Sequence, residues 1–503
     1  MKSKREDFVR QISEGYSFKG ESVILGAAVF EGKTAANVLV RAPLRTFNRH
    51  GLITGATGTG KTKTFQRIAE SLSSAGVSVL LMDMKGDLSG ISRPGTANPK
   101  IEERHSAIGI PWKATGYPVE FLTISAEQGV RLRATVSEFG PILLSKILGL
   151  NETQESVLSM MFKYCDDHKL LLLDLKDIKK VLQFLSNEGK EEVEKEYGRI
   201  SSATTGLILR KIVEIEQEGA DQFFGEESFD VKDLLRLDEK GRGTISILRL
   251  SDIQSRPKMF STFMLCLLAE VYQKFPEEGD LDRPKLIIFI DEAHLIFNEA
   301  SKELLESIET IIRLVRSKGV GIFFCTQVPS DIPPSVLSQL GLKIQHALRA
   351  FTAQDRKAIK LASENFPLTE FYAIDDLITS LGIGEALVTL LNEKGIPTPL
   401  VHTMLCAPES RMDTITAQEL DEIVHRSSIA EKYNRVVDRE SAYELLGARI
   451  EGHDGGFTPQ TGERHEKSTL EKVVESPVAR QVGRVVAREL TRGLLGALLG
   501  RGR

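Results

Sequence analysis

Short apolar runs alternate with amphipathic segments along most of the chain. Four runs rich in Val, Ile, Leu and Phe occupy residues 243–250, 285–292, 319–327 and 342–350. Runs that are apolar throughout are typical of strands buried on both faces, whereas the segments between them have the apolar spacing of helices. The alternation predicts an α/β fold whose mostly parallel sheet is covered by helices on both faces.

Further strands are predicted on both sides of this region. Residues 20–50 contain short apolar runs typical of one or two strands, and residues 118–125 predict another. From His50 onward, a strand, a glycine-rich loop, an amphipathic helix and a buried strand follow one another, which is the pattern of a βαβ unit. Residues 385–405 predict a hairpin with Gly and Pro at its turn, and we expect this hairpin to close the edge of the sheet.

Other parts of the chain differ from this pattern. Residues 137–240 have helical spacing and predict a helical insertion. Residues 447–474 are rich in Gly, Pro and charges and predict a linker, and residues 475–503 predict a basic amphipathic helix. Such a helix can pack between subunits, bind a partner helix or lie on an anionic membrane, and the sequence leaves these uses open. The predicted parts are a short β lead-in (1–50), a first core part (51–136), the insertion (137–240), a second core part (241–446), the linker (447–474) and the helix (475–503).

Composition and charge limit the possible classes of protein. The 503 residues are 41% hydrophobic and 27% charged, which is ordinary for a globular chain of more than one compact part. The net charge of −5 excludes a generally basic nucleic-acid-coating surface, so any DNA contact must be local. The four cysteines lie far apart without metal-ligand spacing, so we expect small core residues in a reducing compartment. No segment has the apolar length of a membrane span, and we expect a cytoplasmic protein.

A glycine-rich segment follows the strand at His50. Residues 55–62, GATGTGKT, match GxxxxGK[ST] between a predicted strand and a predicted helix. The glycines let backbone N–H groups turn toward phosphates, Lys61 balances phosphate charge, and the Thr62 hydroxyl can bind Mg²⁺. The alternative is a glycine turn that binds nothing. We predict that ATP binds to Gly55, Ala56, Thr57, Gly58, Thr59, Gly60, Lys61, Thr62 and Lys63, and that Thr62 also binds its Mg²⁺.

The predicted strand at 285–292 ends in two acids, Asp291 and Glu292. A carboxylate pair at the end of a buried strand needs water or a cation. We predict that Asp291 holds Mg²⁺ and that Glu292 polarises the attacking water as a general base, the alternative being a solvated strand end. The nearby His294 either couples the site to another element or simply begins a helix.

Polar side chains at two other strand ends are further candidates. Gln327 ends the strand that follows the acid pair, and its amide can orient water or sense the γ-phosphate, unless it only leads into a turn. Asp83 and Lys85 end the strand after the glycine-loop helix. These two residues either line the same crevice or cap a turn, because ligands of open α/β sheets gather at carboxyl strand ends.

The order of these motifs, GATGTGKT, MDMKGDL, IIFIDEAH, RSKGVGIFFCTQVPSDIP and EALVTLLNEKGIPTP, resembles the HerA/FtsK group of motor ATPases. Within that group it is most similar to a bacterial HerA-like family of helicases. The resemblance covers about residues 20–410, and the adjacent acids with a glutamine on the next strand are its more specific part. It implies a RecA-like P-loop NTPase core, in which relatives form hexameric rings, hydrolyse ATP at subunit interfaces and pull double-stranded DNA through a pore.

The resemblance also implies an arginine supplied in trans to stabilise transition-state charge. Arg349, on the predicted strand after Gln327, best fits the family pattern as this catalytic residue. Arg313, Arg316 and Arg356 are the other candidates, and a surface salt bridge is the alternative for each of the four arginines.

Two departures limit the analogy. About 50 residues precede the glycine loop, so we expect the N-terminal β-barrel of archaeal HerA proteins to be missing or vestigial, and we assume no nuclease partner. No winged-helix pattern is present near residue 503.

The sequence leaves two alternative functions open. The first is an ATPase that drives double-stranded DNA translocation or unwinding as a homohexamer; the alternative is an ATP-gated switch or assembly scaffold acting on a protein partner.

Overall fold

The computed structural model describes residues 4–450 apart from residues 255, 280, 300, 301, 436 and 438. The chain divides into two compact units. The described parts of residues 1–132 and 229–435 form the first unit, and those of 133–228 and 436–503 form the second. The sheet and the predicted site residues all belong to the first unit.

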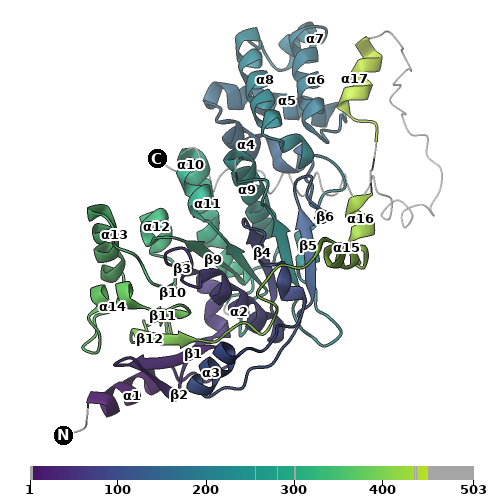
Figure 1. Cartoon of the computed structure of the whole chain (residues 1–503). Coiled ribbons are helices and arrows are strands. Elements are labelled where there is room, and N and C mark those ends of the chain that lie inside the picture. The colour runs from purple at the N-terminus through teal and green to yellow at the C-terminus, as the bar shows by residue number, and fades with distance from the viewer. Residues whose placement is uncertain are drawn as a thin grey trace. The chain divides into compact units, whose positions relative to one another are not determined.

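One twelve-stranded sheet forms the centre of the first unit, in the order β2-β1-β12-β11-β10-β3-β9-β8-β4-β7-β5-β6 (Figure 1). Every neighbouring pair from β10 to β6 is parallel, and every pair from β2 to β10 is antiparallel. The strands are β1 Ser22–Phe30, β2 Lys33–Pro43, β3 Gly51–Thr54, β4 Ser78–Asp83, β5 Val119–Thr123, β6 Val130–Arg131, β7 Ile245–Arg249, β8 Leu286–Ile290, β9 Val320–Thr326, β10 Leu342–Gln345, β11 Glu385–Leu390 and β12 Val401–Leu405.

The central strands are buried along their whole length. Every residue of β3, β4, β8 and β9 is buried, as expected for strands of a parallel sheet that is covered on both sides. The helix after the glycine loop, α2 (Lys61–Ser74), packs on this centre, because the Phe65 ring lies 4.6 Å from that of Phe289, centroid to centroid. The predicted α/β class with a mostly parallel sheet is confirmed.

The hairpin of β11 and β12 does not close the edge of the sheet, contrary to our expectation. β12 pairs with β1, which in turn pairs with β2, so the edge strands are β2 and β6. Gly26 allows the close approach of β1 to β12, since a Cβ at this position would lie 2.0 Å from the Met404 carbonyl oxygen. The lead-in strands therefore complete the main sheet.

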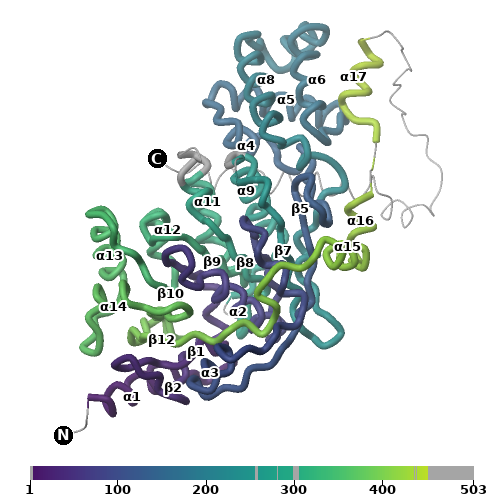
Figure 2. Tube along the Cα trace, viewed as in Figure 1, coloured from purple at the N-terminus to yellow at the C-terminus, as the bar shows by residue number. Residues whose placement is uncertain are grey.

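Helices of the first unit connect and cover these strands, and the course of the chain through β7, β8 and β9 can be followed in Figure 2. Besides α2 they are α1 Lys4–Gly15, α3 Pro99–Ile108, α9 Pro257–Lys274, α10 His294–Glu299, α11 Lys302–Val315, α12 Pro334–Leu337, α13 Ala353–Glu364, α14 Ile374–Ser380, α15 Ala417–His425 and α16 Ala430–Asn434. The helix α1 lies where we predicted only a β lead-in. Phe8, Ile12 and Tyr16 follow one another at the spacing of a helix face and are buried, which explains the helix.

The second unit is helical. Its helices are α4 Val136–Leu148, α5 Glu152–Asp167, α6 Leu175–Ser186, α7 Lys190–Glu196, α8 Ser202–Gln217 and α17 Ala442–Ile450. Residues 229–240, placed in the insertion by the sequence, belong to the first unit instead. The predicted linker was to begin at residue 447, but α17 continues to Ile450. The rest of the linker and the basic tail lie outside the described residues.

Short 3₁₀ helices complete the described structure, at Leu44–Arg49, Ser89–Ser92, Ala220–Gln222, Val231–Leu234, Arg316–Lys318 and Pro329–Asp331. None of the helices in the described part of the chain combines the length and the apolar character that a bilayer crossing requires. The four cysteines are buried and none of them is in a disulfide, as predicted.

Candidate active site

The strand order brings the predicted site segments to one edge of the sheet. The neighbouring strands β3, β9, β8 and β4 are parallel, so their carboxyl ends lie on the same side. The glycine loop follows β3, Gln327 follows β9, the acid pair follows β8, and Lys85 follows β4. Residues far apart in the sequence thus meet at one crevice edge.

Backbone conformation explains the glycines of the loop. Gly55, Gly58 and Gly60 have φ values of 155°, 79° and 110°, which side-chain-bearing residues rarely adopt. A Cβ on Gly55 would lie 2.5 Å from the His346 Cβ, whereas a Cβ on Gly58 would meet nothing within 4 Å. The loop is therefore packed against the protein on one side and open at Gly58.

Hydrogen bonds fix this loop to the ends of the neighbouring strands. The Gly55 N–H donates to the Gln327 carbonyl at 3.1 Å, and the Ala56 N–H donates to the Ala347 carbonyl at 2.8 Å. The Gly384 N–H donates to the Thr59 carbonyl at 3.1 Å. The loop is held by the segments after β9 and β10 and by the start of the hairpin, so its shape is set before a ligand binds.

Lys61 lies inside the curve of the loop. Its Nζ donates to the carbonyls of Gly55 at 2.5 Å and Ala56 at 3.1 Å, and the residue is only 7% exposed. Burial lowers the pKa of Lys61, a shift opposed by the nearby Glu292 and Asp291. The loop lysine and the acid pair therefore belong to one electrostatic cluster.

The two residues after Lys61 differ in exposure and contacts. Thr62 is half-buried in the first turn of α2. The Lys63 ammonium group donates to the Met412 carbonyl and, at 3.3 Å, to Gln66 Oε1. The Lys63 side chain thus contacts a segment away from the loop. Only the backbone N–H of Lys63 therefore remains for its predicted role in nucleotide binding.

Asp291 has the properties of a cation ligand. The residue is 2% exposed, and its Oδ2 atom is buried without a hydrogen-bond donor among the described residues. Burial raises the pKa of Asp291, although Lys85 opposes the shift. Lys85 Nζ, 3.8 Å from this oxygen, forms an ion pair with it but is too far away to donate a hydrogen bond. A carboxylate oxygen without a donor and a threonine hydroxyl are oxygen ligands of the kind that Mg²⁺ prefers, so the donor set of Asp291 and Thr62 fits this cation.

Glu292 sits on a strained turn with a basic neighbour at each carboxylate oxygen. Its φ of 48° is uncommon for a residue other than glycine, and the next N–H, that of Ala293, donates to the Cys325 carbonyl at 3.0 Å. Lys85 Nζ lies 2.5 Å from Glu292 Oε1, and His294 Nδ1 lies 3.3 Å from Oε2. Lys85 Nζ also lies 3.8 Å from Asp291 Oδ2.

Asp83 caps a turn. Its carboxylate accepts hydrogen bonds from the N–H groups of Gly86 at 2.7 Å, Asp87 at 3.3 Å and Leu88 at 3.1 Å. Burial raises the pKa of Asp83 to about 6. Of the two alternatives for Asp83, these contacts favour the capping turn, whereas Lys85 on the same turn reaches the acid pair.

Gln327 and the arginine candidates face solvent. Gln327 is exposed, and its carbonyl is the group that holds the glycine loop. The strand predicted to carry Arg349 ends at Gln345, so this arginine lies in the loop beyond β10, with Nη1 3.5 Å from the Thr379 carbonyl. Arg349 and the other three candidates, Arg313, Arg316 and Arg356, are exposed. Arg349 and Arg356 follow β10, whereas Arg313 and Arg316 precede β9 and lie toward its amino end, away from the site edge. The role of an arginine supplied in trans stays a prediction.

Comparison with known proteins identifies the family. The family model described as "Helicase HerA-like C-terminal" matches residues 29–456, which is most of the chain. The chain belongs to this HerA-like family. The DNA double-strand break repair helicase HerA of Saccharolobus solfataricus is 24% identical over 356 residues, and that of Sulfurisphaera tokodaii is 26% identical over 362 residues. Each match covers 70% of this chain and 64% of the archaeal protein, so the HerA-like chain spans less than two thirds of these relatives.

Solved structures support the fold. The bacterial conjugative coupling protein TrwB, in a trigonal form with sulphate, is similar with a TM-score of 0.53 at 14% identity, covering 81% of this chain and 94% of that one. TrwB in complex with ADP and Mg²⁺ gives a TM-score of 0.50 at 14% identity, covering 79% and 99%. The RecA-like P-loop core and the predicted HerA/FtsK resemblance are confirmed.

Sequence reasoning missed a histidine behind the loop of this HerA-like chain. His346 is fully buried next to Gly55, and its Nε2 lies 3.0 Å from Thr64 Oγ1. Burial lowers the pKa of His346 to about 3, so the ring is neutral beside Lys61. The sequence placed His346 in the middle of the strand predicted at 342–350, whereas β10 ends just before it at Gln345, so no sequence signal pointed to its place behind the loop.

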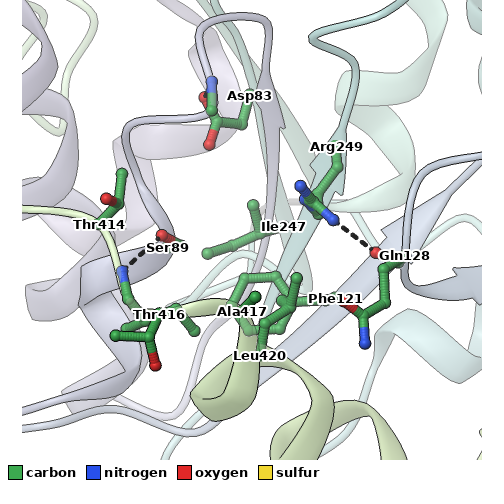
Figure 3. A pocket seen from close by; sticks show the side chains of 12 residues that line it. Asp83, Ser89, Phe121, Gln128, Ile247, Arg249, Thr414, Thr416, Ala417 and Leu420 are labelled. Atoms are coloured by element: carbon green, nitrogen blue, oxygen red, sulfur yellow. Dashed lines mark hydrogen bonds between the residues drawn. The ribbon is translucent and has the colours of Figure 1, made fainter.

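A hollow of about 440 Å³ lies beside β4, β5 and β7, next to the turn that Asp83 caps (Figure 3). Phe121 and Leu420 form apolar walls. Its polar groups have partners: Arg249 Nη1 donates to the Gln128 carbonyl at 2.8 Å, and Ser89 Oγ accepts from the Ile415 N–H at 3.1 Å. These contacts tie two of its polar groups to neighbouring segments of the chain. No cluster of three or more metal-ligating side chains occurs within the described residues.

Proposed function

We propose that the chain hydrolyses ATP at the carboxyl edge of β3, β9 and β8. The observation that carries this proposal is that the glycine loop, with Lys61, and the acid pair of Asp291 and Glu292 lie at one edge of the sheet, because β3, β9 and β8 are neighbouring parallel strands. A glycine loop alone would bind phosphate, but an acid pair beside its lysine adds the two groups that hydrolysis needs, a cation ligand and a base.

The loop residues would bind the phosphates through backbone N–H groups, and Lys61 would move from its two carbonyl contacts onto the β/γ-phosphates. Thr62 and Asp291 would hold Mg²⁺, which supplies charge neutralisation at the phosphates. Glu292 would accept the proton of the attacking water, and Gln327 would orient that water or sense the γ-phosphate. Because the Gln327 carbonyl holds Gly55, a shift at this residue would move the loop directly.

We propose further that hydrolysis drives translocation along double-stranded DNA, or its unwinding, by a homohexameric ring. Support comes from membership of the HerA-like family and from archaeal relatives named as DNA double-strand break repair helicases. The exposed Arg349 would complete the site of a neighbouring subunit. Such a motor would work in the cytoplasm, the compartment that holds DNA and ATP.

The test combines turnover with assembly. Steady-state ATP hydrolysis is measured with and without double-stranded DNA, and molecular mass is measured in Mg·ATP by light scattering. A hexamer that DNA stimulates severalfold supports the motor. A monomer or dimer that hydrolyses ATP at the same rate with and without DNA contradicts it and favours an ATP-gated switch acting on a protein partner.

A further inference from the structure

Each oxygen of the Glu292 carboxylate has a basic side chain next to it, and the two side chains come from different elements. Lys85, on the turn after β4, lies 2.5 Å from Oε1, and His294, the first residue of α10, lies 3.3 Å from Oε2. The Glu292 side chain is only 16% exposed. The Lys85 contact is the short one, whereas Oε2 near His294 accepts no hydrogen bond among the described residues. A glutamate has three rotatable side-chain bonds, so these neighbours restrict it to fewer orientations than a strand-end acid would otherwise adopt.

The contact from Lys85 is itself built on a rigid support. The Asp83 carboxylate accepts three backbone N–H groups of the turn that carries Lys85, and Gly86 in that turn has a φ of 74°. Gln254 donates to the Met84 carbonyl on the other side of Lys85. The backbone of Lys85 is therefore fixed on both sides, which distinguishes this contact from a mobile surface ion pair.

The backbone of Glu292 is also fixed. The Ala293 N–H donates to the Cys325 carbonyl in β9, and the positive φ of Glu292 turns its side chain out of the strand direction. Such strain persists where the surroundings hold it, and it concentrates at functional sites. Both partners of the Lys85–Glu292 contact thus come from backbone segments anchored to the sheet.

We propose that Lys85 and His294 are positioning residues that hold the Glu292 carboxylate in the orientation from which it accepts the water proton. This proposal rests on the proposed function of Glu292. It assigns no contact with substrate to either residue, and it gives Asp83 the task of placing Lys85. Lys85 also lies 3.8 Å from Asp291, so one ammonium group spans both acids of the pair.

The kinetic test uses Lys85→Met, Lys85→Arg, Glu292→Gln and the double variant Lys85→Met/Glu292→Gln. Misplacement of a catalytic group by about 1 Å can cost on the order of 100-fold, so we expect Lys85→Met to lower kcat by about 10- to 100-fold with little change in KM. Lys85→Arg, which keeps the charge, should recover part of the loss. In the Glu292→Gln background, Lys85→Met should change kcat less than about 2-fold, because its target is gone.

Lys285→Met is the matched control. This lysine also pairs with a glutamate, Glu278, but it precedes β8, at the opposite end of the strand from the acid pair. The ATP turnover of Lys285→Met should equal that of the unchanged chain. For His294, the variant His294→Asn keeps a polar group near the place of Nδ1 and should retain more activity than His294→Ala.

Two readouts besides turnover complete the test. Affinity for a fluorescent ADP with Mg²⁺ should stay within about 3-fold in Lys85→Met, since a positioning residue does not bind the ligand. Thermal unfolding of the protein without nucleotide should show non-additive shifts for Lys85→Met and Glu292→Gln, as expected for residues in contact.

The proposal is overturned if Lys85→Met lowers kcat by the same factor with and without Glu292, or if it weakens ADP binding tenfold at unchanged kcat. Failure of the proposed function looks different: the unchanged chain and Lys61→Ala would then show equal, background ATP turnover. In that case the melting temperatures would still test the contact. Additive shifts for Lys85→Met and Glu292→Gln would overturn the Lys85–Glu292 contact, whereas non-additive shifts would support the contact but not its role in hydrolysis.

Discussion

Removal of the Glu70 carboxylate should destabilise the unit that carries the glycine loop. Glu70 lies on α2, the helix that begins with Lys61, and is completely buried. Its Oε2 accepts the Glu409 N–H at 2.8 Å, and its Oε1 accepts the Ser410 N–H at 3.0 Å and the Ser410 hydroxyl at 2.5 Å. Arg67 Nη1 lies 3.3 Å from Oε2. One carboxylate therefore fixes the segment between β12 and α15 to the loop helix.

The size of the effect follows from what Glu70→Ala leaves behind. Two backbone N–H groups lose a charged acceptor, and the mostly buried Arg67 loses one of its two carboxylate partners, the other being Glu409. Breaking a buried charge pair by removing one partner costs about 3–5 kcal/mol. At roughly 2 °C per kcal/mol for a large domain, the melting temperature should fall by about 6–10 °C.

The assay is thermal unfolding followed by intrinsic fluorescence. Glu70→Gln keeps one acceptor oxygen but turns an amide donor toward other donors, so we expect an intermediate loss. Glu422→Ala is the control, because Glu422 is 45% exposed and lies 3.6 Å from Arg93, a pair that contributes less than about 1 kcal/mol. If Glu70→Ala melts within 1 °C of the unchanged chain, the segment is not held by this carboxylate and the reasoning is refuted.

Three further predictions concern the site. Gly55→Ala should abolish binding of a fluorescent ADP, because its Cβ would lie 2.5 Å from the His346 Cβ at a φ of 155°; retained affinity would contradict the loop geometry. Lys61→Ala should weaken ADP binding at least tenfold, measured by the same titration, with Lys285→Met as the unaffected control. His346 has a folded-state pKa of about 3, below its unfolded value of 6.5, so the unfolded chain takes up the proton first as pH falls. Stability from the neutral ring is therefore complete well above pH 6.5 and is lost by up to about 1.4 kcal/mol per pH unit below it. His346→Asn should melt with a shallower pH dependence between about pH 6.5 and 4, and an unchanged slope would contradict the assignment.

The central sheet could be predicted from the sequence because its strands are apolar throughout. The runs at 285–292 and 319–327 became β8 and β9, both fully buried, and the residues at their carboxyl ends met as parallel topology requires. The helix α1 was missed because its apolar side chains are only Phe8, Val9 and Ile12, set among charged and polar residues. The hairpin was misplaced at the edge because no local pattern reveals that β1 pairs with β12 across more than 370 residues.

The site was predictable where chemistry requires fixed spacing and unpredictable where it depends on distant contacts. The glycine loop at residues 55–62 and the acid pair can be recognised in the sequence, because each has characteristic residue types at the end of a predicted strand. Which of Asp83 and Lys85 faces the acid pair depends on the turn that follows β4. In the structure the Asp83 carboxylate accepts hydrogen bonds from that turn, and the Lys85 ammonium group contacts Glu292. His346 and Glu70 act through buried contacts with segments remote in sequence, so no local pattern could assign them.

The account depends most on Glu292 acting beside Lys61 in one nucleotide site. The decisive measurement compares single-turnover ATP hydrolysis with ATP binding in Glu292→Gln and in the unchanged chain. Loss of a general base should reduce the hydrolysis rate by about 10²- to 10⁴-fold while Mg·ATP affinity stays within about 3-fold. Hydrolysis at the normal rate in Glu292→Gln would contradict the account.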